Sequence, residues 1–319
     1  MKLNIHPFLI ISVFLAFSLG NTARLSIFNQ QINGYLYEPI VFFHLVFLIL
    51  LYRLNPLRDV FKKWKVFTLF LATLLISFMF SILNYSFYEN AVAGLYNLRL
   101  FLYFSYFFYL GYYLRESAKA KAYLNKGILL FGFLTVFTSA IQYFFYPDLR
   151  NLFYLGWDPH LYRVFGVFFD TSVAAGIFGV ILIYLYVKNW SRFERLRILS
   201  ITVYFILLLF TYSRSAYLAI SATFFAYLTK KKKWFGLLFF LAVMITSLIL
   251  IPKPFGEGVN LLRIFSIESR IKDYGDALNL WKESPLFGYG YNRLRQIKGD
   301  KVESHAASSF HSSYLTILF

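Results

Sequence analysis

Long runs of apolar residues constrain the fold of this chain more than any other feature. Val66–Leu83, Val167–Val187 and Trp234–Ile251 each carry few or no charges. They are roughly 18–21 residues long, the length that a helix needs to cross about 30 Å of hydrocarbon. These segments are apolar on every face, whereas the strands of a membrane barrel alternate polar and apolar residues. The pattern therefore predicts an all-α fold, a polytopic membrane helical bundle.

The composition agrees with this prediction. Hydrophobic residues make up 59% of the 319 residues and charged residues only 15%, which is more apolar surface than one soluble core can bury. The chain has no cysteine, which excludes disulfides, thiolate nucleophiles and cysteine-ligated metals. The formal net charge of +17 does not indicate nucleic-acid binding, because most basic residues lie in short loops that set membrane orientation. We expect membrane lipids and no nucleic acid as partners.

Ten apolar segments organise the chain, and the last one is incomplete. Only eight residues follow His311, and eight residues of helix span about 12 Å, less than a bilayer requires. The sequence leaves open whether the gene or only this sequence stops there. The segments cover about residues 7–20, 39–53, 66–83, 95–114, 127–146, 166–187, 198–212, 213–229, 234–251 and a last stretch that starts near 311.

The basic loops predict the orientation of the chain in the membrane. Placing the N-terminus in the cytoplasm puts every short basic loop on the cytoplasmic side, as the positive-inside rule requires. These loops span residues 53–65, 115–126, 188–197 and 230–233. The basic residues left on the opposite face or at helix ends are the candidates for function, and they include Arg24, Arg99, Arg150, Arg163 and Arg214.

The same map divides the chain into three parts. Residues 1–251 form the transmembrane bundle, residues 252–311 form a long extracytoplasmic loop, and residues 312–319 begin a truncated final span. Within the loop, Ser269–Glu283 places apolar residues three or four positions apart. That spacing predicts a short amphipathic helix that lies on the membrane surface or caps a cavity.

The outer loop also carries an arginine and a turn. Arg270 lies at the start of the amphipathic helix and is either a solvated loop charge or a ligand for an anion. Pro285 is expected to stop the helix, and Gly288 and Gly290 allow a tight turn after it.

Arg214 has two interpretations. It follows Ser213 between two apolar runs, at the predicted outer boundary of the membrane. The simpler interpretation is an interfacial arginine that extends to lipid phosphates. The alternative is an anion clamp, because a guanidinium at the mouth of a helix bundle can hold a phosphate through two parallel hydrogen bonds, with Ser213 as a neutral donor.

Asp170 and Arg163 form a second candidate pair on the outer face. Arg163 begins the segment RVFGVFFDTS, and Asp170 falls just inside the next predicted span. A carboxylate at that depth is costly and usually pairs with a cation or takes part in function. Asp170 is therefore either a structural partner of Arg163 or Arg214, or a part of the site.

His311 is the candidate proton acceptor. A neutral imidazole near the interface can take a proton from a sugar hydroxyl, since its ordinary pKa is about 6.5. The alternative is a histidine that caps the start of the last helix, and we expect His305 to be an ordinary loop residue. His160, His305 and His311 lack the short spacing of a zinc site, so we expect no metal and no cofactor.

Four segments in order resemble a known family. RVFGVFFDTS, TYSRSAYLA, SRIKDYGDALNLWKESPLFGYGYN and HSSYLTIL are similar to the O-antigen ligase and Wzy-type O-antigen polymerase superfamily of bacterial envelope glycosyltransferases. The resemblance covers about residues 160–319. It implies a GT-C-like multi-helix fold in the bacterial cytoplasmic membrane, an undecaprenyl-pyrophosphate-linked glycan donor, and metal-independent transfer with inversion at the anomeric carbon. The acceptor would be a lipid A core for a ligase or another glycan chain for a polymerase.

The resemblance also assigns residues. The arginines would hold the pyrophosphate and His311 would deprotonate the acceptor hydroxyl. Family members continue through about two further spans, so the activity of this exact chain is not assured. The family's motifs fall on Ser213-Arg214, Arg270, Pro285, Leu286, Gly288, Gly290, His311, Tyr314 and Leu315.

Two other classes of function use some of the same features. A transporter or flippase for a lipid-linked anionic glycan would also need outer-face arginines, and it predicts paired broken helices with internal repeats. A membrane scaffold without chemistry would scatter Arg214, Arg270 and His311. The long outer loop with its own helix favours an enzyme with a site at the membrane surface.

Overall fold

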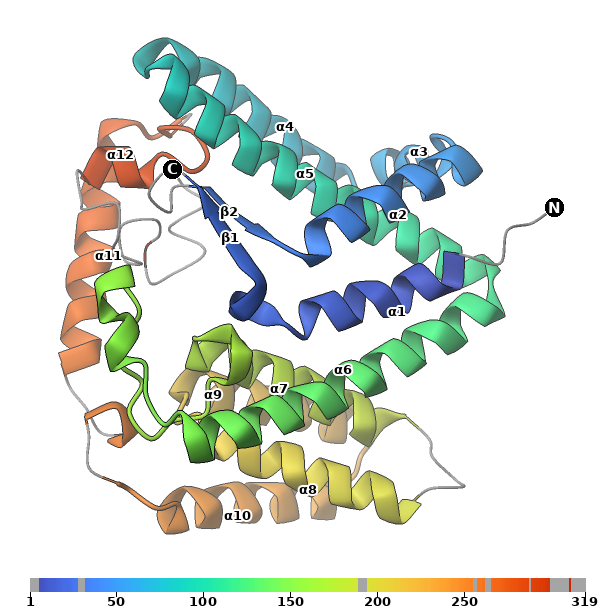
Figure 1. Cartoon of the computed structure of the whole chain (residues 1–319), viewed down its shortest axis with the longest axis vertical. Coiled ribbons are helices and arrows are strands. Elements are labelled where there is room, and N and C mark those ends of the chain that lie inside the picture. The colour runs from blue at the N-terminus through green and yellow to red at the C-terminus, as the bar shows by residue number, and fades with distance from the viewer. Residues whose placement is uncertain are drawn as a thin grey trace. The chain divides into compact units, whose positions relative to one another are not determined.

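The computed structural model describes residues 6–27, 32–188, 194–254, 257–261, 265–286, 288–298 and 310. Within these ranges the chain is mostly helical, as the apolar runs predict. Figure 1 labels the elements, which are α1 (His6–Phe17), β1 (Arg24–Ile27), β2 (Ile32–Tyr35), α2 (Tyr37–Tyr52), α3 (Asn55–Lys63), α4 (Lys65–Ser81), α5 (Phe87–Glu116), α6 (Ala118–Phe145), α7 (Thr171–Val187), α8 (Glu194–Phe210), α9 (Arg214–Lys230), α10 (Trp234–Leu250), α11 (Phe265–Glu283) and α12 (Leu294–Lys298). Single 3₁₀ turns are η1 (Gly20–Ala23), η2 (Ile82–Asn84), η3 (Arg150–Leu155), η4 (Gly166–Phe168) and η5 (Glu257–Val259).

Each of the nine complete apolar segments contains a helix, but fewer helices are long and apolar enough to be clear membrane spans. Among the described residues these are Lys65–Asn84 and Ala118–Phe145, with a third if α2 and α3, bent by 88° at their junction, count as one broken span. Helices α7 and α10 are apolar but have only 17 residues each. A membrane helical protein is therefore supported, while ten spans and a GT-C-like arrangement stay predictions.

Two local expectations were wrong. The all-α prediction missed the antiparallel hairpin β1–β2, in which Arg24 pairs with Tyr35 and Ile27 with Ile32. This ribbon is short and mostly polar or exposed, so it lacks the alternating pattern that identifies a half-buried strand. The segment 53–65 contains helix α3 and not only a loop, because Pro56 and Val60 are buried on one side of a short turn of helix while the charged residues stay exposed.

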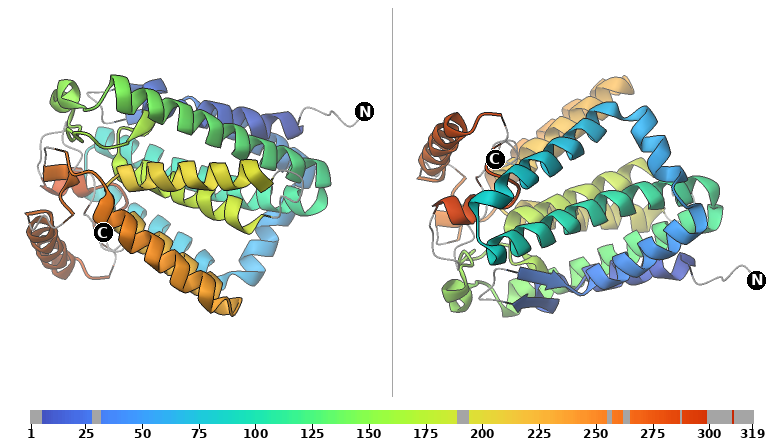
Figure 2. Two further views of the ribbon diagram at one scale, coloured as in Figure 1. Left: turned by 90° about the horizontal axis from the view of Figure 1, so that it is seen from below. Right: turned by 90° about the horizontal axis from the view of Figure 1, so that it is seen from above.

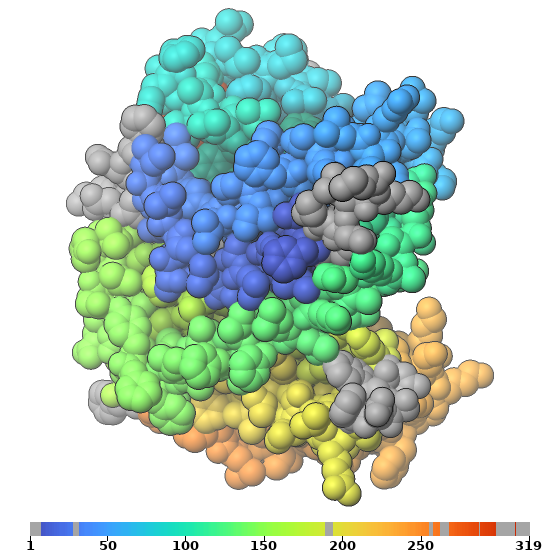
Figure 3. Space-filling model, turned by 45° about the vertical axis from the view of Figure 1, so that its right-hand side comes forward, coloured from blue at the N-terminus to red at the C-terminus, as the bar shows by residue number. Residues whose placement is uncertain are grey.

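The chain forms two compact units. Unit 1 consists of residues 1–17, 23–127 and 264–319. In it α2 packs against α1 and α5, and α3 packs against α4 and α5 (Figures 1 and 2). Its described surface includes a continuous region formed by α1, the hairpin and α2, the blue atoms of Figure 3. The core of this unit includes Ile10, Leu45, Leu48, Tyr109, Tyr113 and Ala120.

Unit 2 consists of residues 18–22 and 128–263. Helix α7 packs against α8 and α9, and α10 packs against α9. The residues of α7 on these contacts are small or apolar, including Ala174, Ala175 and Phe178, each 0% exposed. The predicted division at residues 251 and 311 follows the faces of a membrane, which these contacts do not test, so it stays a prediction.

Candidate functional site

The turn between α8 and α9 carries Ser213-Arg214 and is almost completely buried. Thr211, Tyr212 and Ser213 are at most 4% exposed. Tyr212 has a φ of +51°, an unfavourable conformation for a residue with a Cβ atom. Its hydroxyl donates to the carbonyl of Pro252 at 2.5 Å, and Thr211 Oγ1 donates to Leu208 O at 2.6 Å. These bonds fix an otherwise strained turn.

Arg163 packs directly against this turn. The side chain is 7% exposed, and its Nε donates to the main-chain carbonyl of Thr211 at 2.9 Å. The amide of Val164 donates to Phe210 O at 2.9 Å. A Cβ atom added at Gly258 would lie 3.2 Å from Arg163 Cδ. The two segments that the sequence placed on the same membrane face are therefore in contact within unit 2.

Gln142 of α6 completes this network, and the sequence analysis missed it. Its Oε1 accepts from the amides of Phe165 and Gly166 at 3.0 and 3.1 Å. Its Nε2 donates to Arg163 O at 3.2 Å. Nε2 also donates to Tyr146 O at 3.1 Å. The side chain is 6% exposed, so one glutamine pairs with four main-chain groups inside an apolar region. A single amide side chain within an otherwise apolar run was the signal that could have identified it.

Arg214 is the first residue of α9 and is half-buried. Its Nη1 donates to Leu261 O at 3.3 Å. The first turn of α9 contains no acidic residue, and Ser213 at the N-cap makes no side-chain cap hydrogen bond. Ser213 Oγ lies 3.3 Å from Ser215 Oγ. A cation at the positive end of a helix is electrostatically unfavourable, and the first N–H groups of a helix lack intrahelical partners. The guanidinium and the helix start together favour an anion.

Asp170 has a structural role that differs from the predicted one. It directly precedes α7 and is the N-cap of that helix. Its Oδ1 accepts from the amides of Ser172 and Val173 at 2.6 and 3.0 Å. The ion pairs of the described residues do not include Asp170, so the expected pairing with an outer-face arginine is not observed there. N-capping explains a carboxylate at this position.

The loop residues lie in unit 1. The predicted amphipathic helix is observed as α11, with Arg270 exposed near its start and Ala277 completely buried. Ala277 packs with Leu294 of α12 and with Phe310, which is 4% exposed. His311 and His305 lie outside the described residues. The residue immediately before His311 is nevertheless fixed in a small core together with the helix that carries Arg270.

The turn after α11 has the predicted conformation. The helix ends at Glu283, shortly before the exposed Pro285. Gly288 and Gly290 have φ of +62° and +99°, which residues with a Cβ atom rarely adopt. Ser284 Oγ donates to Gly288 O at 2.7 Å and closes the turn.

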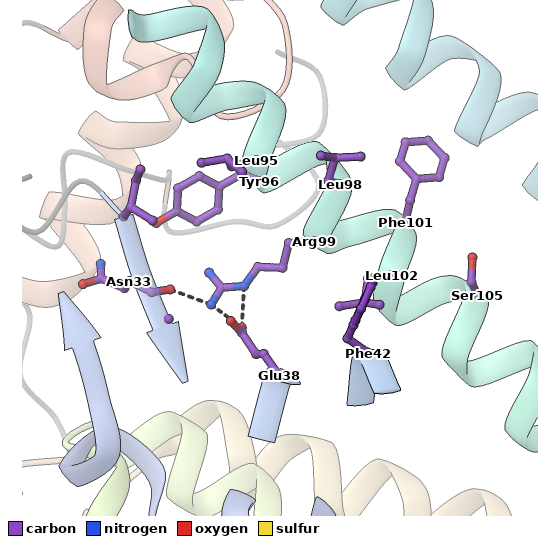
Figure 4. Close-up of a pocket in the computed structure, with 12 residues that line it drawn as sticks. Asn33, Glu38, Phe42, Leu95, Tyr96, Leu98, Arg99, Phe101, Leu102 and Ser105 are labelled. Carbon is purple, nitrogen blue, oxygen red and sulfur yellow. Dashed lines mark hydrogen bonds and ion pairs between the residues drawn. The ribbon is translucent and has the colours of Figure 1, made fainter. Parts of the chain in front are cut away.

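A groove in unit 1 contains another arginine (Figure 4). Arg99 Nε donates to Glu38 Oε1 at 2.5 Å and Nη2 donates to Asn33 O at 2.6 Å. Tyr103 donates to the same carboxylate oxygen at 2.5 Å. Arg99 is thus neutralised by a carboxylate and anchors β2 to α2 and α5. The groove holds about 510 Å³ and is lined by Ile32, Asn33, Gly34, Glu38, Phe42, Leu95, Tyr96, Leu98, Arg99, Phe101, Leu102 and Ser105.

The site residues fall into two groups. Arg163, Asp170, Ser213 and Arg214 belong to unit 2, and Arg270 and the glycine turn belong to unit 1. In the parts of the chain that the structure describes, no three histidine, aspartate or glutamate side chains gather as metal ligands.

Comparison with protein families gives one match. A family model described as O-Antigen ligase matches residues 198–319, the part of the chain that runs from α8 to the C-terminal residue. This segment includes Arg214, Arg270, the glycine turn and His311, but not Arg163 or Asp170. No curated protein and no solved structure matches the chain.

Proposed function

We propose that this chain is a membrane glycosyltransferase, because residues 198–319 match a family model described as O-Antigen ligase. It moves a glycan from an undecaprenyl-pyrophosphate donor to an acceptor hydroxyl. The observation that carries the proposal is the position of Arg214, at the start of α9 and beside a turn fixed by Arg163. Lipid-linked glycan and acceptor are the substrates that the family implies.

Arg214 and the first turn of α9 bind the donor pyrophosphate. A guanidinium donates two parallel hydrogen bonds to phosphate oxygens, and the N–H groups of a helix start add further donors. During transfer the glycosidic C–O bond to the pyrophosphate breaks and negative charge develops on the leaving oxygen. Donors already in place stabilise that charge without reorganisation. Arg270, on α11 of unit 1, is proposed as a further phosphate-binding residue.

His311 is the general base in this proposal. It takes the proton of the acceptor hydroxyl while the acceptor oxygen forms a bond to the anomeric carbon, opposite the leaving pyrophosphate. This in-line arrangement inverts the anomeric carbon and needs neither a metal nor a cofactor. Phe310, the residue before it in the chain, is 4% exposed and packs with Ala277 of α11.

Arg163 and Asp170 contribute through the fold. Arg163 holds the carbonyl of Thr211, two residues before Ser213, and Asp170 caps α7. Both act on the position of the turn and the helix ends, while Arg214 contacts the donor. We also propose the orientation that the basic loops predict, with the N-terminus in the cytoplasm and the loop after α10 outside.

A flippase is the second candidate, and one observation favours it. Helices α2 and α3 meet at an angle of 88° and are apolar enough together to be one broken span. Transporters of this kind have broken helices in corresponding positions of two repeats. Only one such bent pair occurs in the described ranges, so the enzyme explains more of the chain.

The test is glycan transfer from a lipid-pyrophosphate donor by purified protein in detergent. Arg214→Lys keeps the positive charge but loses the planar guanidinium that donates two parallel hydrogen bonds. We therefore expect the transfer rate to fall about 10²-fold or more. Arg150→Lys is the matched control, because Arg150 is 68% exposed and already paired with Asp148 at 2.9 Å. Near-wild-type turnover of Arg214→Lys would contradict the proposal.

A further inference from the structure

Arg293 is a charged residue that the described part of unit 1 buries without a carboxylate partner. Its side chain is 0% exposed. Nη2 donates to Ser81 Oγ at 3.4 Å and to Asn90 Oδ1, while Nε and Nη1 are buried without a hydrogen-bond partner. Burial lowers the pKa of the guanidinium from its usual value, but arginine stays charged at neutral pH.

The aromatic residues around Arg293 compensate this burial only in part. The guanidinium carbon lies 4.2 Å from the ring centre of Tyr85 and 5.7 Å from that of Phe78. A cation–π contact is worth less than the desolvation of an ion, and two unpaired donors add to the cost. The arginine therefore specifies one docked position at the expense of stability.

Gly290 brings the loop close enough for this insertion. A Cβ atom at Gly290 would lie 2.5 Å from Ser81 Oγ and 2.8 Å from Ser81 Cβ, and its φ of +99° is itself unfavourable for other residues. The loop backbone therefore rests on the last residue of α4. Three residues later Arg293 reaches Asn90, in the first turns of α5.

The same segment also packs against α11 and Phe310, which carry or directly precede two of the proposed site residues. Leu294, adjacent to Arg293, is 3% exposed and packs with Ala277 of α11 and with Phe310. Trp281 and Tyr289 pack against this small core. A single segment thus connects the ends of α4 and α5 to the helix that carries Arg270 and to the residue before His311.

We propose that Gly290 and Arg293 form a latch that fixes α11, α12 and Phe310 onto the ends of α4 and α5. Arg293 is a positioning residue for glycan transfer, since it holds α11, which carries Arg270, and Phe310, which directly precedes His311 in the chain. The role in transfer rests on the proposed function, whereas the latch itself does not.

A single introduced cysteine reports on the latch, because the natural chain has none. Ser81→Cys places a thiol beneath Gly290, where the serine is 4% exposed. We expect a maleimide to label it slowly in the otherwise natural protein and at least tenfold faster after Arg293→Met or Gly290→Ala. Arg293→Lys should give an intermediate rate, because lysine keeps the charge but not the planar group that stacks on Tyr85.

Two controls separate a released latch from general unfolding. Arg295→Met removes the same charge two positions away, from a residue that is only partly buried, and should leave the labelling rate unchanged. Ser139→Cys in α6, 1% exposed in unit 2, should stay protected in every latch variant. Unchanged labelling of Ser81→Cys in both Arg293→Met and Gly290→Ala would overturn the latch. Equal gains at Ser81→Cys and Ser139→Cys would make Arg293 a general stability residue and would overturn it too.

Transfer kinetics then test the positioning role. We expect Arg293→Met to lower kcat about tenfold or more while KM for the donor changes less than about twofold, because Arg214 binds the donor independently. Unchanged kcat with faster labelling would overturn the positioning role. Faster labelling in latch variants, combined with no transfer by any form of the protein, would leave the latch intact and remove the proposed function.

Discussion

The turn before α9 and the loop after α11 hold their buried arginines in different ways. In unit 2, Arg163 donates to a main-chain carbonyl, and Gln142 pairs with four main-chain groups nearby. In unit 1, Arg293 rests on aromatic rings and neutral oxygens, and two of its nitrogens have no partner. The turn before α9 is therefore fixed by hydrogen bonds that pair its buried polar groups. The loop after α11 is held by a buried arginine whose donors are only partly paired.

This difference suggests a division of labour. Opening a region in which the buried polar groups are hydrogen-bonded costs a high free energy. Local opening of a segment with unpaired buried donors costs less. A rigid turn suits the binding of a pyrophosphate, because its donors must be in place before charge develops. A loop that opens at lower free energy suits a positioning role, which is the role that we propose for Arg293.

The largest effect is expected at the end of the loop. His311→Ala should lower transfer by about 10²–10⁴-fold, the usual cost of losing a positioned base, while retention of the lipid-linked donor stays unchanged. His311→Asn keeps a hydrogen bond but no proton acceptor and should be equally inactive. His305→Ala is the matched control and should transfer normally. Full activity of His311→Asn in a transfer assay would make His311 a cap and leave the loop without a base.

The next effect tests the network of unit 2 against the loop of unit 1. Gln142→Leu leaves three buried main-chain groups without partners, each costing about 1–3 kcal/mol, so thermal unfolding should show a severe loss of stability. Gln296→Leu in α12 is the control, because Gln296 Oε1 is buried without a partner. It should change stability by less than about 0.5 kcal/mol. Similar losses of stability in Gln142→Leu and Gln296→Leu would contradict the proposed difference between the two regions.

The smallest effect concerns the cap of α7. Asp170→Ala should reduce stability by about 0.5–2 kcal/mol, and Asp170→Asn should restore most of it, because an amide oxygen also accepts the bonds of an N-cap. Transfer by Asp170→Asn should be close to normal. If Asp170→Asn is stable in a melting experiment but inactive in transfer, Asp170 is part of the chemistry and the rigid region does more than hold the donor.

The sequence predicted the features that depend on residue type and on the spacing of apolar residues. Apolar runs located nine helices, and the spacing of Ile271, Tyr274, Leu278 and Trp281 located α11. Glycine chemistry located the turn at Gly288 and Gly290. The orientation rule placed Arg163 and the Arg214 turn on one face, and the structure brings them into contact through Val164 and Phe210.

The sequence did not reveal roles that depend on which groups a side chain contacts. Asp170 reads as a buried carboxylate until the amides of Ser172 and Val173 are seen to bind it. Arg293 looks like one more loop arginine, because burial is set by Ser81, Tyr85 and other residues about 200 positions away. No local pattern reports such a contact. The hairpin β1–β2 was missed for a related reason, since its pairing has no apolar alternation to reveal it.

Donor binding by three forms of the protein tests the division of labour most directly. A lipid-linked pyrophosphate glycan is titrated against the natural chain, Arg214→Lys and Arg293→Met in the same detergent. We predict that Arg214→Lys raises Kd about tenfold or more, since a point charge replaces a two-pronged contact, and that Arg293→Met leaves Kd within about twofold. Unchanged binding by Arg214→Lys together with weakened binding by Arg293→Met would place the donor in the loop and contradict the account.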